Sequence, residues 1–364
     1  MYNTTKEVRM TRVLKYLLLH VAALPSLALA SDLPAVRFAH HDWELACDNT
    51  RTCRVAGYHE DGAELAVSVL LTRKAGPHAG VTGQVMLGEY GALPALERLP
   101  DVFELALSID GQPVGTVAMS RTSMLAELTQ AQVSALLASL VRTSRIEFTH
   151  GEDVWHLSDR GASAVLLKMD EFQGRIGTPG ALTRKGQKDE GSVRPPLPAP
   201  VVKAAPLPAP LPGDAHFTEA HESTLLAALR ALDLGDDCPD VSEPGGEVPE
   251  LQAVRLTESR MLLSARCWGG AYNIGYGFWV VNATPPHQPV LVTTQGSEQA
   301  DGTLFASHKG RGLGDCWTSE AWTWDGSRFV PTSVTSTGMC RLMAPGGAWS
   351  LPTLVTEVHG AAQR

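Results

Sequence analysis

Apolar and polar positions between residues 31 and 190 follow two periods. They alternate over most of the first hundred residues, which is the pattern of β-strands. The period then lengthens to that of a helix over Thr129–Val141, with Thr129 as N-cap, and again over Arg160–Phe172, capped by Ser158. Strands are predicted at Glu64–Thr72, Gly83–Gly88, Val102–Ile109, Val114–Met119, Ser144–Thr149 and Val154–Leu157. This order predicts an α+β domain at 31–190, with an antiparallel, β-rich sheet and two helices.

A short hairpin opens this domain. Trp43, Leu45 and Cys47 alternate with Glu44 and Ala46, which predicts a strand with one buried face. A turn follows, and the extended pattern resumes after it. We expect a disulfide between Cys47 and Cys53 to close this hairpin as a structural staple rather than a redox pair.

The pattern in residues 214–364 predicts one helix followed by strands and turns. The helix is predicted over His216–Leu232, with leucines on one face. Strands are predicted at Met261–Trp268, Tyr272–Asn282, Val290–Thr294, Thr303–His308, Ala321–Trp324, Arg328–Pro331 and Cys340–Met343. We expect a mostly antiparallel β domain, either an open sheet or a partial barrel, preceded by one helix.

A proline-rich segment separates the two regions. Eight of the 21 residues in Ser192–Pro212 are proline, and no apolar period runs through them. Because proline fixes φ and lacks an amide proton, this composition favours an extended, solvated polyproline spacer. We therefore predict a linker at 191–213 between two folded domains.

The first 30 residues have the pattern of an export signal. A basic start precedes the apolar run Val13–Leu24, and Ala28–Ala30 is a small-x-small cleavage site, so we expect the mature chain to begin at Ser31. The alternative is an uncleaved anchor helix, but the run is short and His20 and Pro25 interrupt the region. No later stretch is apolar enough to span a membrane. We expect a periplasmic or secreted bacterial protein.

The charge argues against nucleic acid as a partner. The chain carries a net charge of −9, and residues 1–30 hold four basic residues and one acid, so the net charge after cleavage is −12. Phosphate binding needs a basic patch, which this balance disfavours.

Six cysteines in an exported chain indicate disulfides. Nearest-neighbour pairing gives Cys47–Cys53, Cys238–Cys267 and Cys316–Cys340, although six cysteines permit 15 pairings. No C-x-x-C or finger-type histidine spacing supports zinc. The acidic loop Asp233–Asp240 could hold calcium, but its spacing is not that of an EF-hand.

No familiar catalytic motif is present. His40, His41 and Asp42 could act as a metal or general-base group, but they sit at the start of a strand, where solvated side chains are common. His221-Glu222 begins the helical zinc motif, but Leu225 stands in place of its second histidine. We find no nucleophile elbow and no phosphate loop, so we expect no catalytic residues, no metal and no cofactor.

Aromatic residues of the C-terminal half form the best candidate binding surface. Rings that alternate along strands can stack on a glycan or contact a protein. The alternative interpretation is that these rings fill the core of the β domain. The candidate binding residues are Trp279, Arg311, Asp315, Trp317, Trp322 and Trp324.

Several segments resemble a bacterial exported family of unknown function, DUF1176. They are DWELACDNTRTCRVAGY at 42–58, LSDRGASAVLLKMDEFQGRIGTPGAL at 157–182, CWGGAYN at 267–273, GRGLGDCW at 310–317 and WTWDG at 322–326. The first half also distantly resembles the invasion-associated B proteins. Neither resemblance implies catalytic residues.

Together these patterns favour a non-enzymatic binding or structural protein of the cell envelope. Its expected partner is an envelope protein or a cell-wall glycan. The alternative is an envelope hydrolase, or an inhibitor of one, centred on His40 and His41 or on the Arg311–Trp317 loop.

Overall fold

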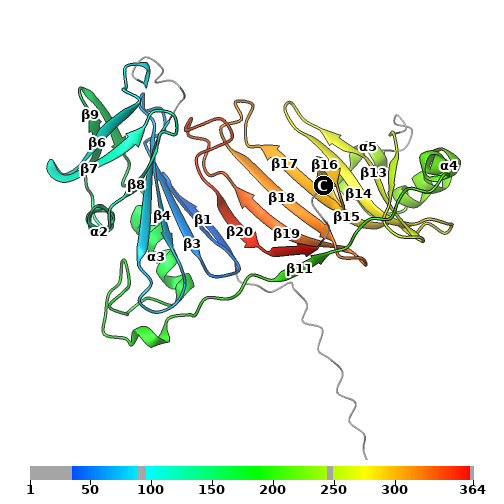
Figure 1. The fold of residues 1–364 in the computed structure, drawn as a ribbon, viewed down its shortest axis with the longest axis horizontal. Helices are drawn as coiled ribbons and strands as arrows, with labels where there is room; N and C mark the ends of the chain where they lie inside the picture. The colour runs from blue at the N-terminus through cyan, green and yellow to red at the C-terminus, as the bar shows by residue number, and fades with distance from the viewer. Residues whose placement is uncertain (1–34, 89, 91–95, 244–248, 361–364) are drawn as a thin grey trace, which may run out of the picture. The chain divides into compact units, whose positions relative to one another are not determined.

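The computed structural model describes residues 35–88, 90, 96–243 and 249–360 (Figure 1). The residues from Pro34 onward form one compact unit. Most of its secondary structure is antiparallel β-sheet with few helices, as the sequence predicted. The predicted export signal lies outside the described residues. None of the helices described has the length and apolar character needed to cross a bilayer.

The first sheet has six antiparallel strands in the order β1-β2-β3-β4-β5-β8. Its first three strands pair in chain order, and β8 joins the far edge beside β5. The bounds are β1 Val36–His40, β2 Trp43–Cys47, β3 Cys53–Tyr58, β4 Val67–Arg73, β5 Val81–Leu87 and β8 Leu125–Leu128. The sequence pattern missed β1 and β8, which are short edge strands.

The second sheet has four antiparallel strands in the order β10-β9-β6-β7. The bounds are β6 Val102–Ile109, β7 Gln112–Ser120, β9 Ile146–His150 and β10 Asp153–Leu157. Its inner residues and those of the first sheet enclose one continuous hydrophobic core.

Two helices pack on this core. Helix α2 (Gln130–Ser139) begins at Thr129, which forms a reciprocal capping box with Gln132, so the predicted N-cap is confirmed. Helix α3 (Ala162–Gln173) lies against the first sheet (Figure 1). The predicted cap Ser158 is wrong: the N-cap is Gly161, and the Ser158 hydroxyl instead donates to Asp42 at 2.7 Å.

Strand β2 is buried on both faces, not on one as predicted. Trp43 and Leu45 point into the main core, while Ala46 points into a second cluster that includes Met343 and Trp349. The sequence pattern was misleading because the second face is covered by residues almost 300 positions later in the chain.

The proline-rich segment is only partly a solvated spacer. Strand β11 (Val201–Ala204) pairs in parallel with β21 (Glu357–Gly360), so the prediction of a backbone solvated throughout is wrong there. Leu197 donates a backbone hydrogen bond to Thr50 on one side, and Ala205 donates one to Trp324 on the other. The proposed domain boundaries stay a prediction. Short 3₁₀ turns flank the segment at Glu190–Ser192 and Asp214–His216.

A third sheet carries helices on one face. Helices α4 (Phe217–Arg230) and α5 (Pro239–Ser242), joined through the 3₁₀ turn Gly235–Asp237, bury their apolar residues against Met261, Leu263 and Trp279. The strand order is β12-β13-β14-β15. The bounds are β12 Gln252–Arg255, β13 Arg260–Gly269, β14 Ile274–Asn282 and β15 Val290–Gly296.

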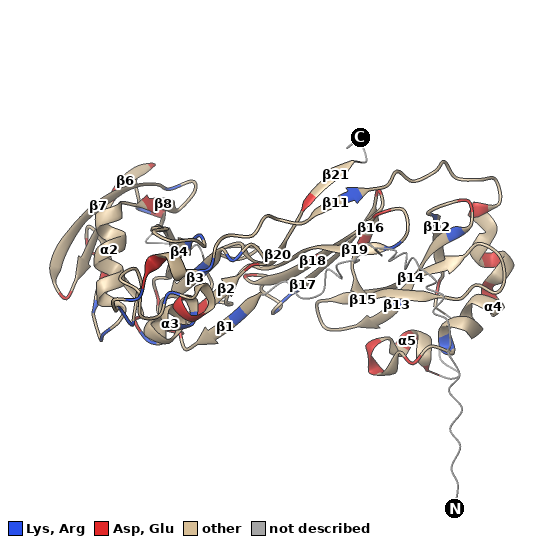
Figure 2. Ribbon diagram, turned by 90° about the horizontal axis from the view of Figure 1, so that it is seen from below, with Lys and Arg blue, Asp and Glu red and all other residues tan. Residues whose placement is uncertain are grey.

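The last sheet has the order β16-β17-β18-β19-β20 and packs against the other face of the third sheet through Leu262, Phe278, Leu304 and Trp324. The bounds are β16 Glu298–Ala300, β17 Thr303–Lys309, β18 Trp317–Trp324, β19 Phe329–Ser336 and β20 Leu351–Val355. The predicted strand Cys340–Met343 is wrong, since these residues form a loop. Most positions of these strands carry no charge (tan in Figure 2).

All three nearest-neighbour cysteine pairs are confirmed. Disulfides join Cys47 to Cys53, Cys238 to Cys267, and Cys316 to Cys340. No free cysteine remains among the described residues.

Candidate functional site

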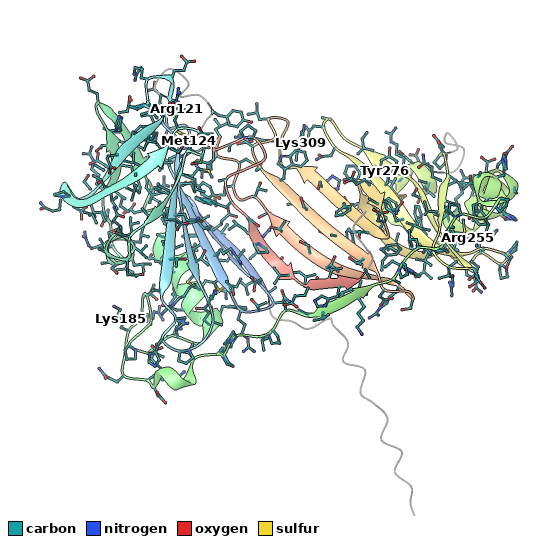
Figure 3. All side chains as sticks on the ribbon, in the orientation of Figure 1. Arg121, Met124, Lys185, Arg255, Tyr276 and Lys309 are labelled. Carbon is teal, nitrogen blue, oxygen red and sulfur yellow. A yellow bond between two sulfur atoms is a disulfide. The ribbon has the colours of Figure 1, made fainter. Side chains whose placement is uncertain are left out.

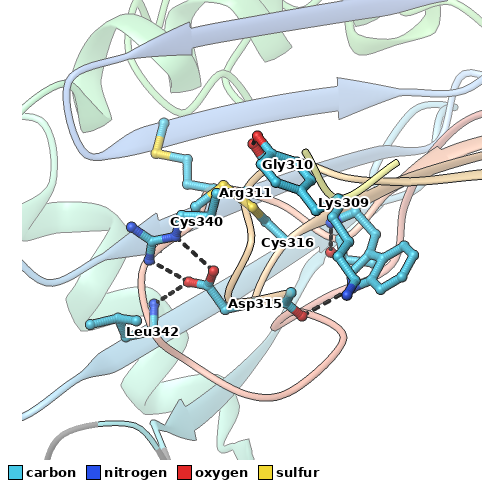
Figure 4. Close-up of a disulfide and its surroundings, with 12 residues drawn as sticks. Lys309, Gly310, Arg311, Asp315, Cys316, Cys340 and Leu342 are labelled. Atoms are coloured by element: carbon cyan, nitrogen blue, oxygen red, sulfur yellow. Dashed lines mark hydrogen bonds and ion pairs between the residues drawn. A yellow bond between two sulfur atoms is a disulfide. The ribbon is translucent and has the colours of Figure 1, made fainter. Parts of the chain in front are cut away.

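The loop Lys309–Trp317 connects β17 to β18 and holds three of the predicted site residues. The Arg311 guanidinium donates to the Asp315 carboxylate through Nε at 2.8 Å and Nη2 at 2.6 Å (Figure 4). The same carboxylate accepts the backbone N–H of Leu342 at 2.8 Å. The adjacent Cys316–Cys340 disulfide ties the loop to the same segment. The loop is therefore fixed by a covalent bond and an ion pair side by side.

The ion pair keeps both partners charged. The guanidinium of Arg311 is the main reason that the pKa of Asp315 lies below its ordinary value, and the Asp315 carboxylate raises the pKa of Arg311. The Asp315 side chain has no exposed area, whereas that of Arg311 is 39% exposed. Asp315 is thus a structural acceptor and is not accessible to a ligand.

A second loop packs against the first. Asn273, in the turn between β13 and β14, donates from Nδ2 to the carbonyl of Lys309 at 3.0 Å and accepts the Lys309 N–H at 2.9 Å. The hydroxyl of Tyr272 donates to the Gly310 carbonyl at 3.4 Å. Two of the segments that carry the family resemblance, 267–273 and 310–317, therefore meet here.

The two loops present an exposed apolar surface with one cation. Leu313 is 60% exposed and Tyr272 is 46% exposed. The ammonium of Lys309 lies 5.5 Å from the centre of the Trp317 ring, whose Nε1 donates to the Gly314 carbonyl at 2.9 Å (Figure 4). We call these four residues (Tyr272, Lys309, Leu313 and Trp317) the loop surface. It can contact a partner but holds no acid–base pair, because its charged neighbours are already engaged.

The structure does not bring the other predicted site residues to this surface. Trp279 has no exposed area and Trp324 is 1% exposed, and both lie in hydrophobic cores between layers. Neither ring can contribute to the predicted binding surface, because a ring with almost no accessible area cannot stack on a partner. Trp322 is partly buried and packs on the same core as Trp324.

The suspected histidines lie at the end of β1 and in the turn after it, while their neighbour Asp42 is engaged with other residues. His40 is exposed at the end of β1, and His41 occupies the turn with a positive φ. Asp42 is buried and accepts from Ser158 and from Arg341, in the latter case at 2.8 Å. Its carboxylate therefore holds the chain together instead of activating a histidine.

Sequence reasoning missed a buried carboxylate in β2. Glu44 accepts the Tyr58 hydroxyl at 2.8 Å and the backbone N–H of Met339 at 2.6 Å. Burial raises the pKa of Glu44 above its ordinary value, and burial together with the Glu44 charge raises that of Tyr58. No signal in the sequence could have identified this group, because its partner Met339 is 295 positions away.

One cluster among the described residues has the composition of a metal site: Asp315, Cys316 and Cys340. Its sulfur atoms are joined to each other and its carboxylate is paired with Arg311, so these atoms are occupied. In the acidic loop Asp233–Asp240, Asp240 pairs with Arg266 at 3.0 Å.

The fold and the site define a β-rich protein stapled by three disulfides, with two loops fixed into one exposed surface. The chain belongs to the family described as "Protein of unknown function (DUF1176)", whose model matches residues 37–356. It is similar to the uncharacterised protein YpfG of Escherichia coli K12, with 28% identity over 361 residues, covering 93% of this chain and 97% of the relative. The comparison with solved structures gave no significant match. The resemblance to invasion-associated B proteins stays a prediction.

Proposed function

We propose that this chain is an exported protein of the cell envelope that acts without catalysis, by binding a protein partner through the loop surface. The observation that carries this proposal is the fixed exposure of Leu313 and Tyr272. Exposed apolar side chains that cluster on a protein surface mark interaction sites more often than exposed apolar side chains that stand alone.

The rigidity of the two loops supports binding. The Cys316–Cys340 disulfide and the Arg311–Asp315 pair hold one loop, and Asn273 holds the other to it. A surface that is ordered before binding loses little conformational entropy on association, which favours affinity.

Export is supported by the cysteines and by the pattern of residues 1–30. Three disulfides with no free thiol among the described residues suit an oxidising compartment. The basic, apolar and small-residue regions of the first 30 residues suit a cleaved signal.

The environment of the perturbed acids supports a non-catalytic role. Glu44 and Asp315 have shifted pKa values, and both carboxylates are held by backbone N–H groups and fixed side chains. Such contacts fix both carboxyl groups within the fold, which suits a structural role.

Affinity capture tests the proposal. The oxidised chain from Ser31 is immobilised and cross-linked in periplasmic extract of a bacterium that carries it. We expect one partner to be retained by the wild type and lost with the double variant Leu313→Ser, Tyr272→Ser. The matched control is Val102→Ser, since Val102 is 68% exposed on β6 and lies outside the loop surface.

Two outcomes would contradict the proposal. One is a captured partner that the double variant retains as well as the control does. The other is a hydrolytic activity on cell-wall material that is abolished by His41→Ala or Arg311→Ala, which would favour the hydrolase alternative.

A further inference from the structure

A groove of about 310 Å³ lies between the third sheet and strand β16. Its floor is formed by Leu262 and Phe278, which also belong to the core between the third and last sheets. The groove is therefore the open end of that core, where the layers separate. Its volume is at the lower end of the range for small-molecule sites.

The strand register places the groove residues on one face. Gln252 of β12 pairs with Ser264 of β13, which pairs with Phe278 of β14, so the three side chains form one row across the sheet. The opposite face of these strands carries Leu263 and Trp279 and is covered by helices. Only the groove face is open to a ligand.

Tyr276 forms an aromatic wall of the groove. It belongs to β14, where Figure 3 labels it, and is 37% exposed. The next residue, Gly277, lies so close to the Trp279 ring that an added Cβ would come within 2.0 Å of it. Because this backbone is packed so tightly, the Tyr276 ring is held on a rigid strand.

Several polar groups of the groove walls make no hydrogen bond to the part of the chain that the structure describes. Among the described residues, none hydrogen-bonds to the Tyr276 hydroxyl, the Ser264 hydroxyl or the Gln299 amide. The Gln252 amide has one hydrogen-bond partner within the described part of the chain: it donates to the Glu250 carboxylate at 3.4 Å. Hydroxyl and amide groups offer both donors and acceptors, so they can match a ligand rich in hydroxyls.

The charge of the groove narrows the ligand class. Among the described residues that line it, Glu298 is the charged one, and none is Lys or Arg. An anionic ligand would meet a carboxylate in a chain whose net charge is −9. A neutral ligand with an apolar face for the ring and the floor, and hydroxyls for the amides, fits this set of groups.

We propose that the groove binds a neutral saccharide, with the C–H face of a sugar ring on Tyr276 and its hydroxyls on Gln252, Ser264 and Gln299. This site is separate from the loop surface, and the inference does not depend on the proposed function. It assigns the chain a glycan contact in addition to a protein contact.

Titration calorimetry with defined sugars tests the inference. The probes are tetramers of N-acetylglucosamine and of α-1,4-glucose, both neutral, with the anionic tetramer of galacturonic acid as a charge control. We expect one neutral tetramer to bind, at least tenfold tighter than the anionic one. Tyr276→Ala should weaken binding at least tenfold, and Tyr276→Phe no more than about threefold.

The matched control is Tyr272→Ala, which removes a ring of the same type and similar exposure from the loop surface. It should leave saccharide affinity unchanged, and Tyr276→Ala should leave partner capture unchanged. Should Tyr276→Ala fail to fold, Gln299→Ala takes its place, with an expected loss of at least threefold. Any of three results would overturn the inference. The first is that neither neutral tetramer binds at millimolar concentration, and the second is that the anionic tetramer binds equally well. The third is that Tyr276→Ala, or Gln299→Ala in its place, retains the affinity of the wild type.

Discussion

Replacement of Asp315 by alanine should destabilise the protein far more than the loss of an exposed carboxylate. The Asp315 carboxylate has no exposed area and accepts from Arg311 and from the backbone of Leu342. Leu342 has a φ of 54°, a left-handed conformation that costs a non-glycine residue about 1 kcal/mol or more unless its surroundings hold it there. Asp315 is one of the groups that hold it.

The magnitude follows from these contacts. A hydrogen bond to a charged group contributes about 1.5–3 kcal/mol, and Leu342 N–H loses such a bond in Asp315→Ala. The half-exposed Arg311 can turn to water, so its pair adds no more than about 1 kcal/mol. We expect Asp315→Ala to lower the free energy of unfolding by about 1.5–4 kcal/mol.

Urea unfolding of the oxidised protein, followed by tryptophan fluorescence, measures this loss. The control is Asp101→Ala, because Asp101 pairs with Arg121 at 2.7 Å but its side chain is 89% exposed. That change should cost less than about 1 kcal/mol. If the two variants lose the same stability, the reasoning on the 309–317 loop is refuted.

The effect of Asp315→Ala should depend on pH. Since Arg311 holds the pKa of Asp315 below its ordinary value of 3.8, the carboxylate stabilises the fold fully above that pH. The stabilisation is lost as the pH falls through the lowered pKa. The difference between wild type and variant should therefore shrink below pH 3.8, which the same unfolding experiment at several pH values checks.

Three further predictions concern stability. Burial raises the pKa of Glu44 above 4.5, so the protonated carboxyl group is the form that the fold favours. The stability that this form provides is lost as the pH rises from 4.5 through the raised pKa. Glu44→Gln should therefore flatten this part of the pH profile of thermal unfolding. Serine in place of both cysteines should cost about 3 kcal/mol for Cys316–Cys340 but about 2 kcal/mol for Cys47–Cys53, because the cysteines of the first bridge are 24 positions apart and those of the second are 6 apart. Denaturant midpoints in the opposite order would contradict this. Gly57→Ala should cost about 1–3 kcal/mol in thermal unfolding, because the new Cβ would lie 2.3 Å from a buried indole ring, whereas Gly80→Ala, which has open space, should change little.

The sequence allowed good prediction wherever the determining residues are close in the chain. The cysteine pairs follow from spacing and compartment, and the start of helix α2 follows from the Thr129–Gln132 capping box. Both depend on contacts within a few tens of positions.

Prediction failed where distant residues decide the environment. Alternation in β2 could not reveal that Glu44 is covered by residues beyond position 338. Trp279 is covered by helices α4 and α5, which precede its strand in the chain, whereas Trp317 lies at the end of a loop, and the sequence pattern did not show which of the two rings would be covered. The groove beside Tyr276 depends on the register of three strands, which the sequence does not specify.

The pairing of β11 with β21 has a consequence for how the protein can be produced. A recombinant form that stops before Glu357 would leave the amides and carbonyls of residues 201–204 without their neighbour. An uncovered strand edge is a template for another chain. Such shortened material would be prone to exchange strands between molecules and to form dimers or aggregates, so a recombinant form should keep β21 intact.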